Sequence, residues 1–407
     1  MHRNGVSNAI AAGLLVAGVL IGATGFYVAT TYQPKTATQT ETATMRLTAM
    51  ATVTAPPTAT QTVLVTTTLA TTVTPISGSP WKTAAEYPLQ ISDAIGVSAQ
   101  QCVNSTAYVY CIGGQDVSGG PRNAAYTSSA ISSSSGNITY WAPDSSLYPQ
   151  SIFAQACVTH SGFVYCVGGT YDDAGDDVAS SYYAPLSGDG VVGTWAATTA
   201  YPVPVDGQYC VASSGYIYCV GGWNEADGTN ATSVVSNSVY YASLSSSGIG
   251  SWSPSTPYPA NTYFPSCFAA GGYIYCLGGV DGNGNAVSAD YYAPLSSSGV
   301  GTWTQTTAYP LQMVGQACAI SSGYVYCVGG VTASDAYADL VYYASISSAG
   351  IGTWTQAAYY PVSTWTTCVT SSGNLYCVGG LDNSSAGENG ATYYASLDSL
   401  SGVTTSD

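Results

Sequence analysis

Positive charge is nearly absent from this chain. Of 407 residues only five are Lys or Arg, against 21 Asp or Glu, and past residue 76 only Lys82 and Arg122 are basic. Proteins that bind nucleic acid or anionic lipid rely on Lys and Arg, so neither is an expected partner of this region. A surface with so few ionised groups also loses little stability when its carboxylates are protonated, so we expect tolerance of acid.

Side chains for catalysis are also scarce. After the first 80 residues the chain has a single histidine, His160, and a single arginine, Arg122. Copper-oxidase chemistry and arginine-clustered sialidase chemistry are therefore excluded. Phosphate-binding loops, nucleophile elbows and metalloprotease helices are absent from the sequence. We expect no cofactor and no catalytic residue, and the one enzymatic alternative left is glycoside cleavage by a pair of carboxylates.

The N-terminus carries a long uncharged apolar run instead. Residues 9–29 are 21 mostly apolar residues, enough to span a bilayer core as a helix, and Arg3 precedes them as the positive-inside rule prefers. We expect a signal or positive region at 1–8 and a transmembrane helix or signal anchor at 9–29. This predicts a single-pass protein of the cell membrane, with the rest of the chain outside. The alternative is a signal peptide that is removed after export.

The first residues also resemble archaeal pilin-type (class III) signal sequences. The matching residues are Arg3, Gly5 and the apolar run from Val6. In that family a peptidase cleaves after the glycine and leaves the helix on the mature protein. The resemblance implies cleavage after Gly5 and a helix that sits in the membrane or in a filament core.

A threonine-rich segment follows at 30–78. Residues 36–74 include 17 threonines, with prolines around them and no hydrophobic period. This composition predicts an extended extracellular stalk that carries O-linked sugar. The alternative is a plain disordered linker.

From Trp81 onward the chain repeats every 50 to 57 residues. A clear unit starts at Cys318 as CAISSGYVYCVGG, continues through an acidic loop, and ends as VYYASISSAGIGTWTQAAYYP. Alternation of apolar and polar residues, tyrosines, β-branched residues and Gly-rich turns predict four short strands per unit. Units of this size with four strands are typical of β-propellers. We therefore expect an all-β, six-bladed propeller at 79–398 and a C-terminal tail at 399–407.

The ring is expected to close through its N-terminal strand. The last unit has its Tyr393-Tyr394 strand but no tryptophan after it, whereas an extra tryptophan segment stands at the front, at 81–87. That segment supplies the missing fourth strand of the sixth blade. Such closure removes an open sheet edge.

Each unit has two cysteines with eight residues between them. In the unit from Cys210 to Cys219, a two-residue turn at Ser214-Gly215 places the cysteines opposite each other, within disulfide range. Twelve cysteines in one repeated setting indicate an oxidising compartment, and zinc is disfavoured because no histidine partners them. The expected disulfides are Cys102–Cys111, Cys157–Cys166, Cys210–Cys219, Cys267–Cys276, Cys318–Cys327 and Cys368–Cys377.

The repeats resemble the kelch repeat. The shared features are a Gly pair that ends a hydrophobic strand, a tyrosine on the next strand and a tryptophan, as in Gly221-Gly222, Tyr240-Tyr241 and Trp252. Five units match, whereas the first offers only Tyr126 in place of the double tyrosine. The Tyr-to-Trp gap is longer than in kelch repeats, and the cysteines are an addition. The resemblance implies a kelch-like propeller, a group that includes binding proteins and a few enzymes.

One face of the propeller collects the acidic, amide and aromatic residues. The loops after the Gly pairs and those around the Tyr-Pro segments lie on this face, and the opposite face has mainly short Ser-Gly turns. The candidate ligand residues are Asp116, Asp172, Asp173, Trp223, Glu225, Asp227, Tyr263, Asp281, Asp335, Trp365 and Asp382. Such a surface suits sugars, cationic partners or calcium, and the alternative is that these are solvated loops.

We expect no metal site, and two short motifs mark candidate positions for bound groups. Asp281, Asn283 and Asn285 alternate like the start of a calcium loop but lack the distal glutamate. Sequons for N-glycosylation begin at Asn104, Asn137, Asn230 and Asn383.

The sequence favours a non-catalytic cell-surface binding or adhesion module for glycan or protein. The membrane is expected as a partner through the N-terminal helix. Two alternatives remain open: a structural subunit of the envelope or of a surface filament, and a carboxylate-based glycoside hydrolase.

Overall fold

The computed structural model divides the chain into two units, Met1–Gly78 and Ser79–Asp407. Of the second unit it describes residues 79–88, 98–105, 107–116, 120–132, 135–171, 176–224, 234–382 and 388–401, and some backbone between 90 and 97. In the first unit it describes only the backbone of β1 (Leu20–Ile21), β2 (Thr24–Gly25), β3 (Tyr27–Ala29), β4 (Thr44–Ala55) and β5 (Ala59–Ala70). The helix expected at 9–29 and the stalk expected at 30–78 lie outside the residues described in full, and both stay predictions. Among the described residues, no helix has the length and apolar character needed to cross a bilayer.

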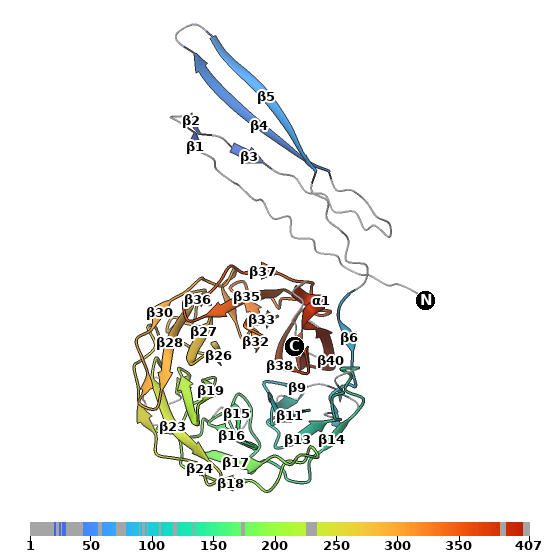
Figure 1. Ribbon diagram of the computed structural model, residues 1–407, viewed down its shortest axis with the longest axis vertical. Coiled ribbons are helices and arrows are strands. Elements are labelled where there is room, and N and C mark those ends of the chain that lie inside the picture. Colours follow the sequence, from blue (N-terminus) through green and yellow to red (C-terminus); the bar gives the residue numbers. More distant parts are fainter. Residues whose placement is uncertain are drawn as a thin grey trace. The chain divides into compact units, whose positions relative to one another are not determined.

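The second unit is a six-bladed β-propeller, as expected, with the blades in chain order around an axis (Figure 1). Blade 1 consists of β10 (Gln101–Ser105), β11 (Tyr108–Ile112), β13 (Ala125–Ser128) and β14 (Trp141–Pro143). Blade 2 consists of β15 (Ala156–His160), β16 (Phe163–Val167), β17 (Ser181–Pro185) and β18 (Ala196–Ala197). Blade 3 consists of β19 (Tyr209–Ser213), β20 (Tyr216–Val220), β23 (Val239–Ser245) and β25 (Ser253–Pro254). Blade 4 consists of β26 (Ser266–Ala270), β27 (Tyr273–Leu277), β28 (Tyr291–Ser296) and β30 (Thr304–Gln305). Blade 5 consists of β32 (Ala317–Ser321), β33 (Tyr324–Val328), β35 (Val341–Ser347) and β37 (Thr355–Gln356). Blade 6 consists of β38 (Thr364–Ser371), β39 (Asn374–Asp382), β40 (Glu388–Ser396) and β6 (Lys82–Thr83). The first strands of the blades adjoin one another in a closed ring around the axis.

Strand β6 completes the sixth blade. Lys82 lies opposite Tyr394 and Thr83 opposite Tyr393, so the N-terminal strand of the propeller pairs with β40. Figure 1 shows β6, in blue, beside the red strands of the last blade. The propeller is therefore closed by its two chain ends.

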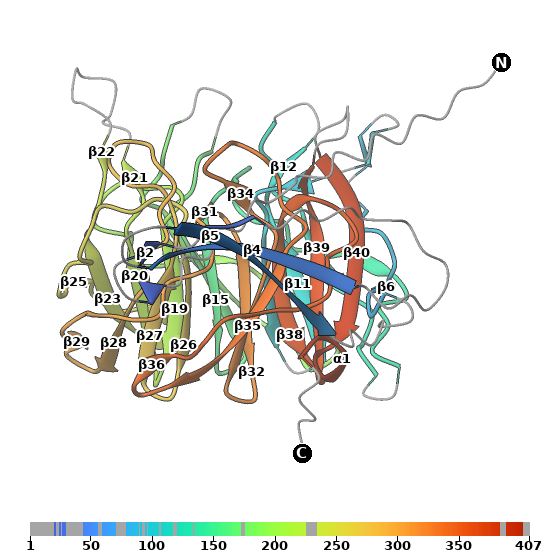
Figure 2. The ribbon, with the colours of Figure 1, turned by 90° about the horizontal axis from the view of Figure 1, so that it is seen from above.

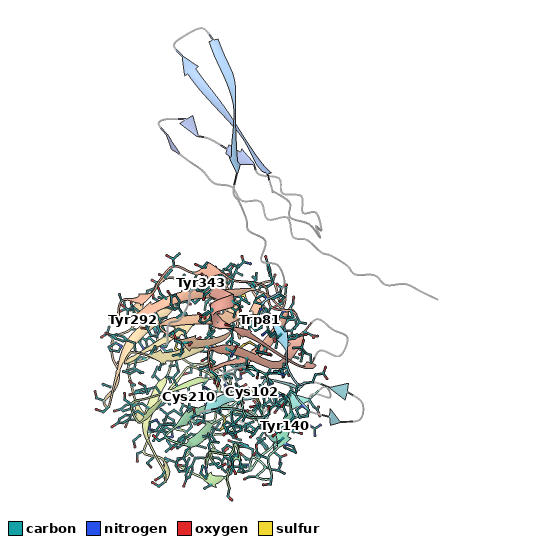
Figure 3. The ribbon with its side chains drawn as sticks, turned by 45° about the vertical axis from the view of Figure 1, so that its right-hand side comes forward. Trp81, Cys102, Tyr140, Cys210, Tyr292 and Tyr343 are labelled. Atoms are coloured by element: carbon teal, nitrogen blue, oxygen red, sulfur yellow. A yellow bond between two sulfur atoms is a disulfide. The ribbon has the colours of Figure 1, made fainter. Side chains whose placement is uncertain are left out.

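The six disulfides follow from the hairpin between the first two strands of each blade. In blade 3, Ser214 and Gly215 form a two-residue turn with φ of 50° and 81°, the left-handed values of a type I′ turn. The register then places Cys210 opposite Cys219, with their Cα atoms 4.1 Å apart. The other five pairs have the same arrangement, so the predicted disulfides are confirmed. Figure 3 labels Cys102 and Cys210 near the axis, whereas Tyr140 and Tyr292 lie nearer the rim.

The apolar core is divided among the six interfaces between blades. One cluster, for example, joins Val369, Tyr376 and Val378 of blade 6 to Val109 and Cys111 of blade 1. A four-stranded blade has two apolar faces and therefore needs a neighbour on each side. The core consequently requires a closed ring.

The Trp and Tyr-Pro segments lock neighbouring blades together. Tyr201, which follows the last strand of blade 2, packs edge-on against Trp252 of blade 3, with ring centroids 5.0 Å apart, and against Tyr240 at 5.4 Å. The indole N–H of Trp252 donates to the carbonyl of Thr199 at 3.2 Å. The Tyr–Trp contacts are Tyr87–Trp141, Tyr148–Trp195, Tyr201–Trp252, Tyr258–Trp303, Tyr309–Trp354 and Tyr360–Trp81.

Blade 1 follows the same plan despite its divergent sequence. Tyr126 lies opposite Cys111, the position that the first of two tyrosines holds in the other blades, and its ring contacts Tyr87 at 5.2 Å. One tyrosine therefore suffices for the contact between blades 6 and 1.

The packed domain extends past the expected boundary at 398. Helix α1 (Leu397–Ser401) buries Leu397 and Leu400, and its Ser401 accepts hydrogen bonds from Tyr326 and Tyr343 of blade 5. In other blades the equivalent of Tyr326 donates to a turn between the third and fourth strands, as Tyr275 does to Ser347. Helix α1 takes the place of that turn because the fourth strand of blade 6 comes from the other end of the chain.

A buried carboxyl group, that of Asp290, holds the start of the third strand of blade 4. It is fully buried and accepts hydrogen bonds from the backbone N–H groups of Gly278 (3.1 Å) and Tyr309 (2.7 Å). In blades 3 and 5 the same two N–H groups bond to backbone carbonyls, and valine stands at the equivalent position. Burial raises the pKa of Asp290 to about 7, although both hydrogen bonds oppose the shift.

Closure of the ring is tested by Trp81→Ala. Trp81 is 7% exposed and packs on Tyr360, so its loss removes a contact that holds the N-terminal strand of the propeller against blade 5. We expect the free energy of unfolding to fall by about 3–5 kcal/mol in chemical denaturation. Trp303→Ala removes the same contact within the continuous chain and should cost a similar amount. Lys82→Ala, at an exposed neighbour, should cost less than about 1 kcal/mol. A Trp81 variant as stable as the Lys82 variant would contradict this closure.

Asp290 predicts that stability rises as the pH falls. The folded-state pKa of about 7 lies above the value of about 4 for an unfolded aspartate, so the native protein binds the proton more tightly. The resulting stability is complete below pH 4 and is lost as the pH rises through 7, by about 4 kcal/mol. Asp290→Asn should flatten the pH dependence of unfolding between pH 4 and 8. Asp335→Asn is the control, because that exposed carboxylate stays in solvent. An unchanged slope in Asp290→Asn refutes the prediction.

Candidate functional site

The loops expected on one face do lie together at one end of the ring. Short ladders join the segment before the first strand of a blade to the segment after its Gly pair. They are β9 (Val97–Ser98) with β12 (Gln115–Asp116) and β31 (Met313–Val314) with β34 (Val331–Thr332), whereas β21 (Trp223–Asn224) pairs with β22 (Val234–Val235) within the loop that follows the Gly pair of blade 3. Figure 2 shows β12, β21, β22 and β34 toward one end of the ring and α1 toward the other.

A chain of backbone hydrogen bonds runs around the axis on this face. It links the residues that stand three positions before the first cysteine of blades 1 to 5, all with φ between 50° and 63°. In blades 2 to 5 the N–H of this residue donates to the carbonyl of the equivalent residue in the preceding blade, at 2.9 to 3.4 Å. The linked residues are Ala99, Ala154, Gly207, Phe264 and Gly315. In blade 6 the equivalent Trp365 instead belongs to β38 and pairs with Leu381, so the chain of bonds is open there.

Phe264 is an outlier within this set. The left-handed region suits glycine, and alanine tolerates it, but a bulky side chain in it is strained. Phe264 has φ of 50°, and its ring packs edge-on against Trp365, with centroids 4.8 Å apart. Strain of this kind costs about 1–3 kcal/mol and is concentrated at functional sites.

Four aromatic rings form a row across the face. Trp223 contacts Tyr263 at 5.8 Å, Tyr263 contacts Phe264 at 4.2 Å, and Phe264 contacts Trp365. Two glycines of the backbone chain make room for this row. A Cβ added to Gly207 would meet the ring of Tyr263, and one added to Gly315 would meet the ring of Trp365. We call Trp223, Tyr263, Phe264 and Trp365 the aromatic row.

A groove of about 740 Å³ opens beside the row, over the loops of blades 4 and 5. Tyr263, Phe264 and Trp365 line it together with Asp281 and Asp335. Asn285 and Gln312 add amide groups, and valines form much of the remaining wall. Its volume lies within the range of small-molecule sites, and its lining combines aromatic surface with a few polar groups, as such sites do.

Asp281 is a fixed, ionised acceptor in this groove. Its Oδ1 accepts the backbone N–H groups of Asn283 (2.8 Å) and Asn285 (2.9 Å), and the bond from Asn285 is the main cause of its lowered pKa. The turn closes further through Asp281 N–H and the carbonyl of Asn285 at 2.9 Å. The alternating Asp and Asn residues thus build a turn, and Asp281, Asn283 and Asn285 stay a weak candidate for calcium.

Tyr263 is held by a buried carboxylate. Its hydroxyl donates to Oδ2 of Asp206 at 3.0 Å, and Asp206 is 6% exposed. Burial raises the pKa of Tyr263 well above its usual range, and the neighbouring Asp206 adds to the shift. Tyr263 therefore stays protonated and presents a fixed ring to the groove.

Two of the other predicted ligand residues have structural roles. Asp116 is 3% exposed and forms an ion pair with Arg122, so the structure uses it inside blade 1. Asp382 accepts a hydrogen bond from the side chain of Asn389 in blade 6. Asp172, Asp173, Glu225 and Asp227 lie outside the described residues. The structure therefore brings together Tyr263, Asp281, Asp335 and Trp365, with Trp223 joined to them through Tyr263.

Two of the four sequon asparagines are described. The side-chain N–H of Asn104 donates to the carbonyl of Thr370 in blade 6 at 2.8 Å, so this amide is used in packing between blades. Asn137 is half-buried. Asn230 and Asn383 lie outside the described residues. N-glycosylation stays a prediction.

Sequence reasoning named Asn285 only as a candidate calcium ligand, and it missed Gln312 of the groove and the buried Asp206. A signal for the row was present: Phe264 and Trp365 stand where other repeats have Ala or Gly. Comparing the repeats position by position reveals this departure.

The propeller also has a known structural counterpart. The sequence matches no family model and no curated protein. The fold is similar to the solved structure of YjhT, with a TM-score of 0.58 and 13% sequence identity over 76% of this chain and 95% of that one. At this identity the likeness shows the fold alone. The chain is thus a six-bladed β-propeller with an aromatic, acidic groove on one face.

Proposed function

We propose that the propeller is a non-catalytic binding module for neutral glycans, displayed outside the cell. The observation that carries the proposal is the groove in which the aromatic row adjoins Asp281, Asp335 and two amide side chains. Sugar rings stack their C–H faces on aromatic rings, and their hydroxyl groups bond to carboxylates and amides. The groove offers both kinds of contact within one cavity.

The charge of the groove favours a neutral sugar over an acidic one. Its charged lining residues are the two aspartates, and the two basic side chains of the propeller are engaged elsewhere. Arg122 pairs with Asp116, and Lys82 lies over the ring of Tyr394 at 5.7 Å. Carboxylated or sulfated sugars would meet like charge without a cation in the groove.

The rigidity of the site supports binding without large rearrangement. Asp281 is fixed by hydrogen bonds from two backbone N–H groups, and Tyr263 is fixed by its hydrogen bond to Asp206. Gly315 has no side chain and so leaves room for the ring of Trp365. A preorganised site loses less entropy when a ligand binds. The six disulfides support an extracellular location, because such bonds persist in oxidising compartments. We also propose that an N-terminal helix anchors the protein in the membrane and that the propeller is a member of the kelch-repeat family.

Trp365→Ala tests the role of the row. Loss of the indole should weaken binding of neutral oligosaccharides by about tenfold or more, measured on the full-length protein with manno-, gluco- and galacto-oligosaccharides. Tyr359→Ala is the control, since Tyr359 is an aromatic residue 58% exposed that does not line the groove. Equal binding by both variants would refute the proposal, as would absence of binding by the wild type.

Gly315→Ala tests the same site without removing the indole. Alanine adopts the required φ at Ala99 and Ala154, so the backbone tolerates it, but the new methyl group would clash with the Trp365 ring. We expect the fold to persist and the indole to move, with a loss of binding similar to that of Trp365→Ala. Unchanged affinity together with a shifted indole fluorescence would contradict this role.

A further inference from the structure

The aromatic rings that line the groove do not share one plane. The rings of Tyr263 and Phe264 have centroids 4.2 Å apart, and their planes are inclined by 45°. The rings of Phe264 and Trp365 have centroids 4.8 Å apart, and their planes are inclined by 88°. All three residues line the groove. Its aromatic wall therefore consists of inclined rings and offers no single flat surface.

An unusual backbone conformation brings the first two rings together. Consecutive side chains of an extended strand point to opposite faces, so neighbouring residues in a strand would not share one groove. Phe264 instead has φ of 50°, in the left-handed region, and its ring contacts that of Tyr263. The strained backbone thus accompanies an arrangement in which two consecutive rings line the same wall.

Backbone hydrogen bonds hold these two residues on both sides. The N–H of Phe264 donates to the carbonyl of Gly207 at 2.9 Å, and its carbonyl accepts the N–H of Gly315 at 3.4 Å. Tyr263 exchanges two bonds with Val280, at 3.0 and 2.8 Å. The angle between the rings is therefore set by the scaffold before a ligand binds.

The linkage of a glycan determines whether its sugar rings are coplanar. In β-1,4-linked glucose or mannose both bonds of the linkage are equatorial, and successive rings lie close to one plane in an extended ribbon. Linkages with an axial bond incline successive rings, as in α-1,4-linked glucose, α-1,2-linked mannose and β-1,4-linked galactose. Because sugar rings stack face-on against aromatic rings, a ribbon fits a flat aromatic surface and an inclined chain fits inclined rings.

We infer that the groove selects glycans with inclined sugar rings over flat ribbons. The inference rests on the proposed function, since it names the class of glycan that the same groove would bind. One sugar unit would lie against Tyr263 and Phe264 and the next against Trp365. A ribbon meets one of these surfaces at a time, because the other is turned away from its plane.

Phe264 is the residue on which this selection depends, because its ring belongs to both inclined pairs. Glycine stands at the equivalent positions of blades 3 and 5, Gly207 and Gly315, and makes the same backbone bonds there. Glycine also adopts a φ of 50° without strain. Phe264→Gly therefore removes the ring from the wall and keeps the backbone.

The test compares linkage isomers in calorimetric titrations of the full-length protein. The ribbon probes are cellohexaose and β-1,4-mannohexaose. The inclined probes are maltohexaose, α-1,2-mannohexaose and β-1,4-galactohexaose. The wild type should bind its tightest inclined probe about tenfold or more tightly than the tighter ribbon, because a rigid wall discriminates by shape.

Two variants separate the ring angles from binding in general. Phe264→Gly should bring the ratio of inclined to ribbon affinity close to one, with an unchanged circular dichroism spectrum. Asp335→Ala is the matched groove variant, because Asp335 lines the groove without contributing a ring. Its loss should weaken both classes of probe by the same factor and keep the ratio.

The outcomes distinguish this inference from the proposed function. Ribbons that bind as tightly as inclined probes, or a ratio that survives Phe264→Gly, overturn the selection and leave groove binding intact. Absence of binding by every probe overturns both. A crystal structure of the wild type with its tightest probe should show successive sugar units inclined along the three rings. Units that lie in one plane on a single ring refute the inference.

Discussion

The edge contact between a tyrosine of one blade and a tryptophan of the next is the interaction on which this propeller depends. Tyr201 and Trp252 illustrate it, with ring centroids 5.0 Å apart and an indole hydrogen bond back to Thr199. Each aromatic pair fixes the angle and the spacing between two blades, and Tyr360 with Trp81 repeats it where the chain ends meet. Each blade has two apolar faces to bury and therefore needs a neighbouring blade on each side. Six blades meet this need by forming a closed ring with six such contacts. The disulfides act inside single hairpins and add little to the assembly of the ring.

Because the six blades repeat one arrangement, the positions at which one blade differs from the others are informative. Every blade packs against its two neighbours in the same way. A residue that differs from those at the equivalent positions of the other blades, without a packing reason, is therefore a candidate for function. Phe264 and Trp365 depart where Ala and Gly suffice in the other blades. Phe264 holds a strained backbone conformation, and Gly315 leaves room for Trp365. These departures converge on one sector of one face, beside the groove.

The scarcity of charge shapes both stability and recognition. With Lys82 and Arg122 as its basic residues, the propeller is held by packing, backbone ladders and disulfides instead of ion-pair networks. Asp290 shows that a carboxyl group can replace two backbone acceptors deep in a blade, where its raised pKa favours acidic conditions. On the face that carries the groove, the same scarcity leaves amides, carboxylates and aromatic rings as the exposed groups, a set that supports the proposal of neutral hydroxyl-rich ligands.

The sequence by itself determined the features that depend on local spacing. Eight residues between Cys210 and Cys219 set the turn, the register and the disulfide, and the unmatched Trp81 segment indicated how the ring closes. The end of the ring on which the acidic loops lie was also predictable, because strand connectivity assigns each loop to an end of the blade. Which loop residues meet was decided only by tertiary structure. Asp116 and Asp281 look alike in sequence, yet one is buried in an ion pair and the other lines a groove. Gln100, Gln155, Gln208 and Gln316 come from four different blades, and they lie together around the axis only because the six blades form one ring.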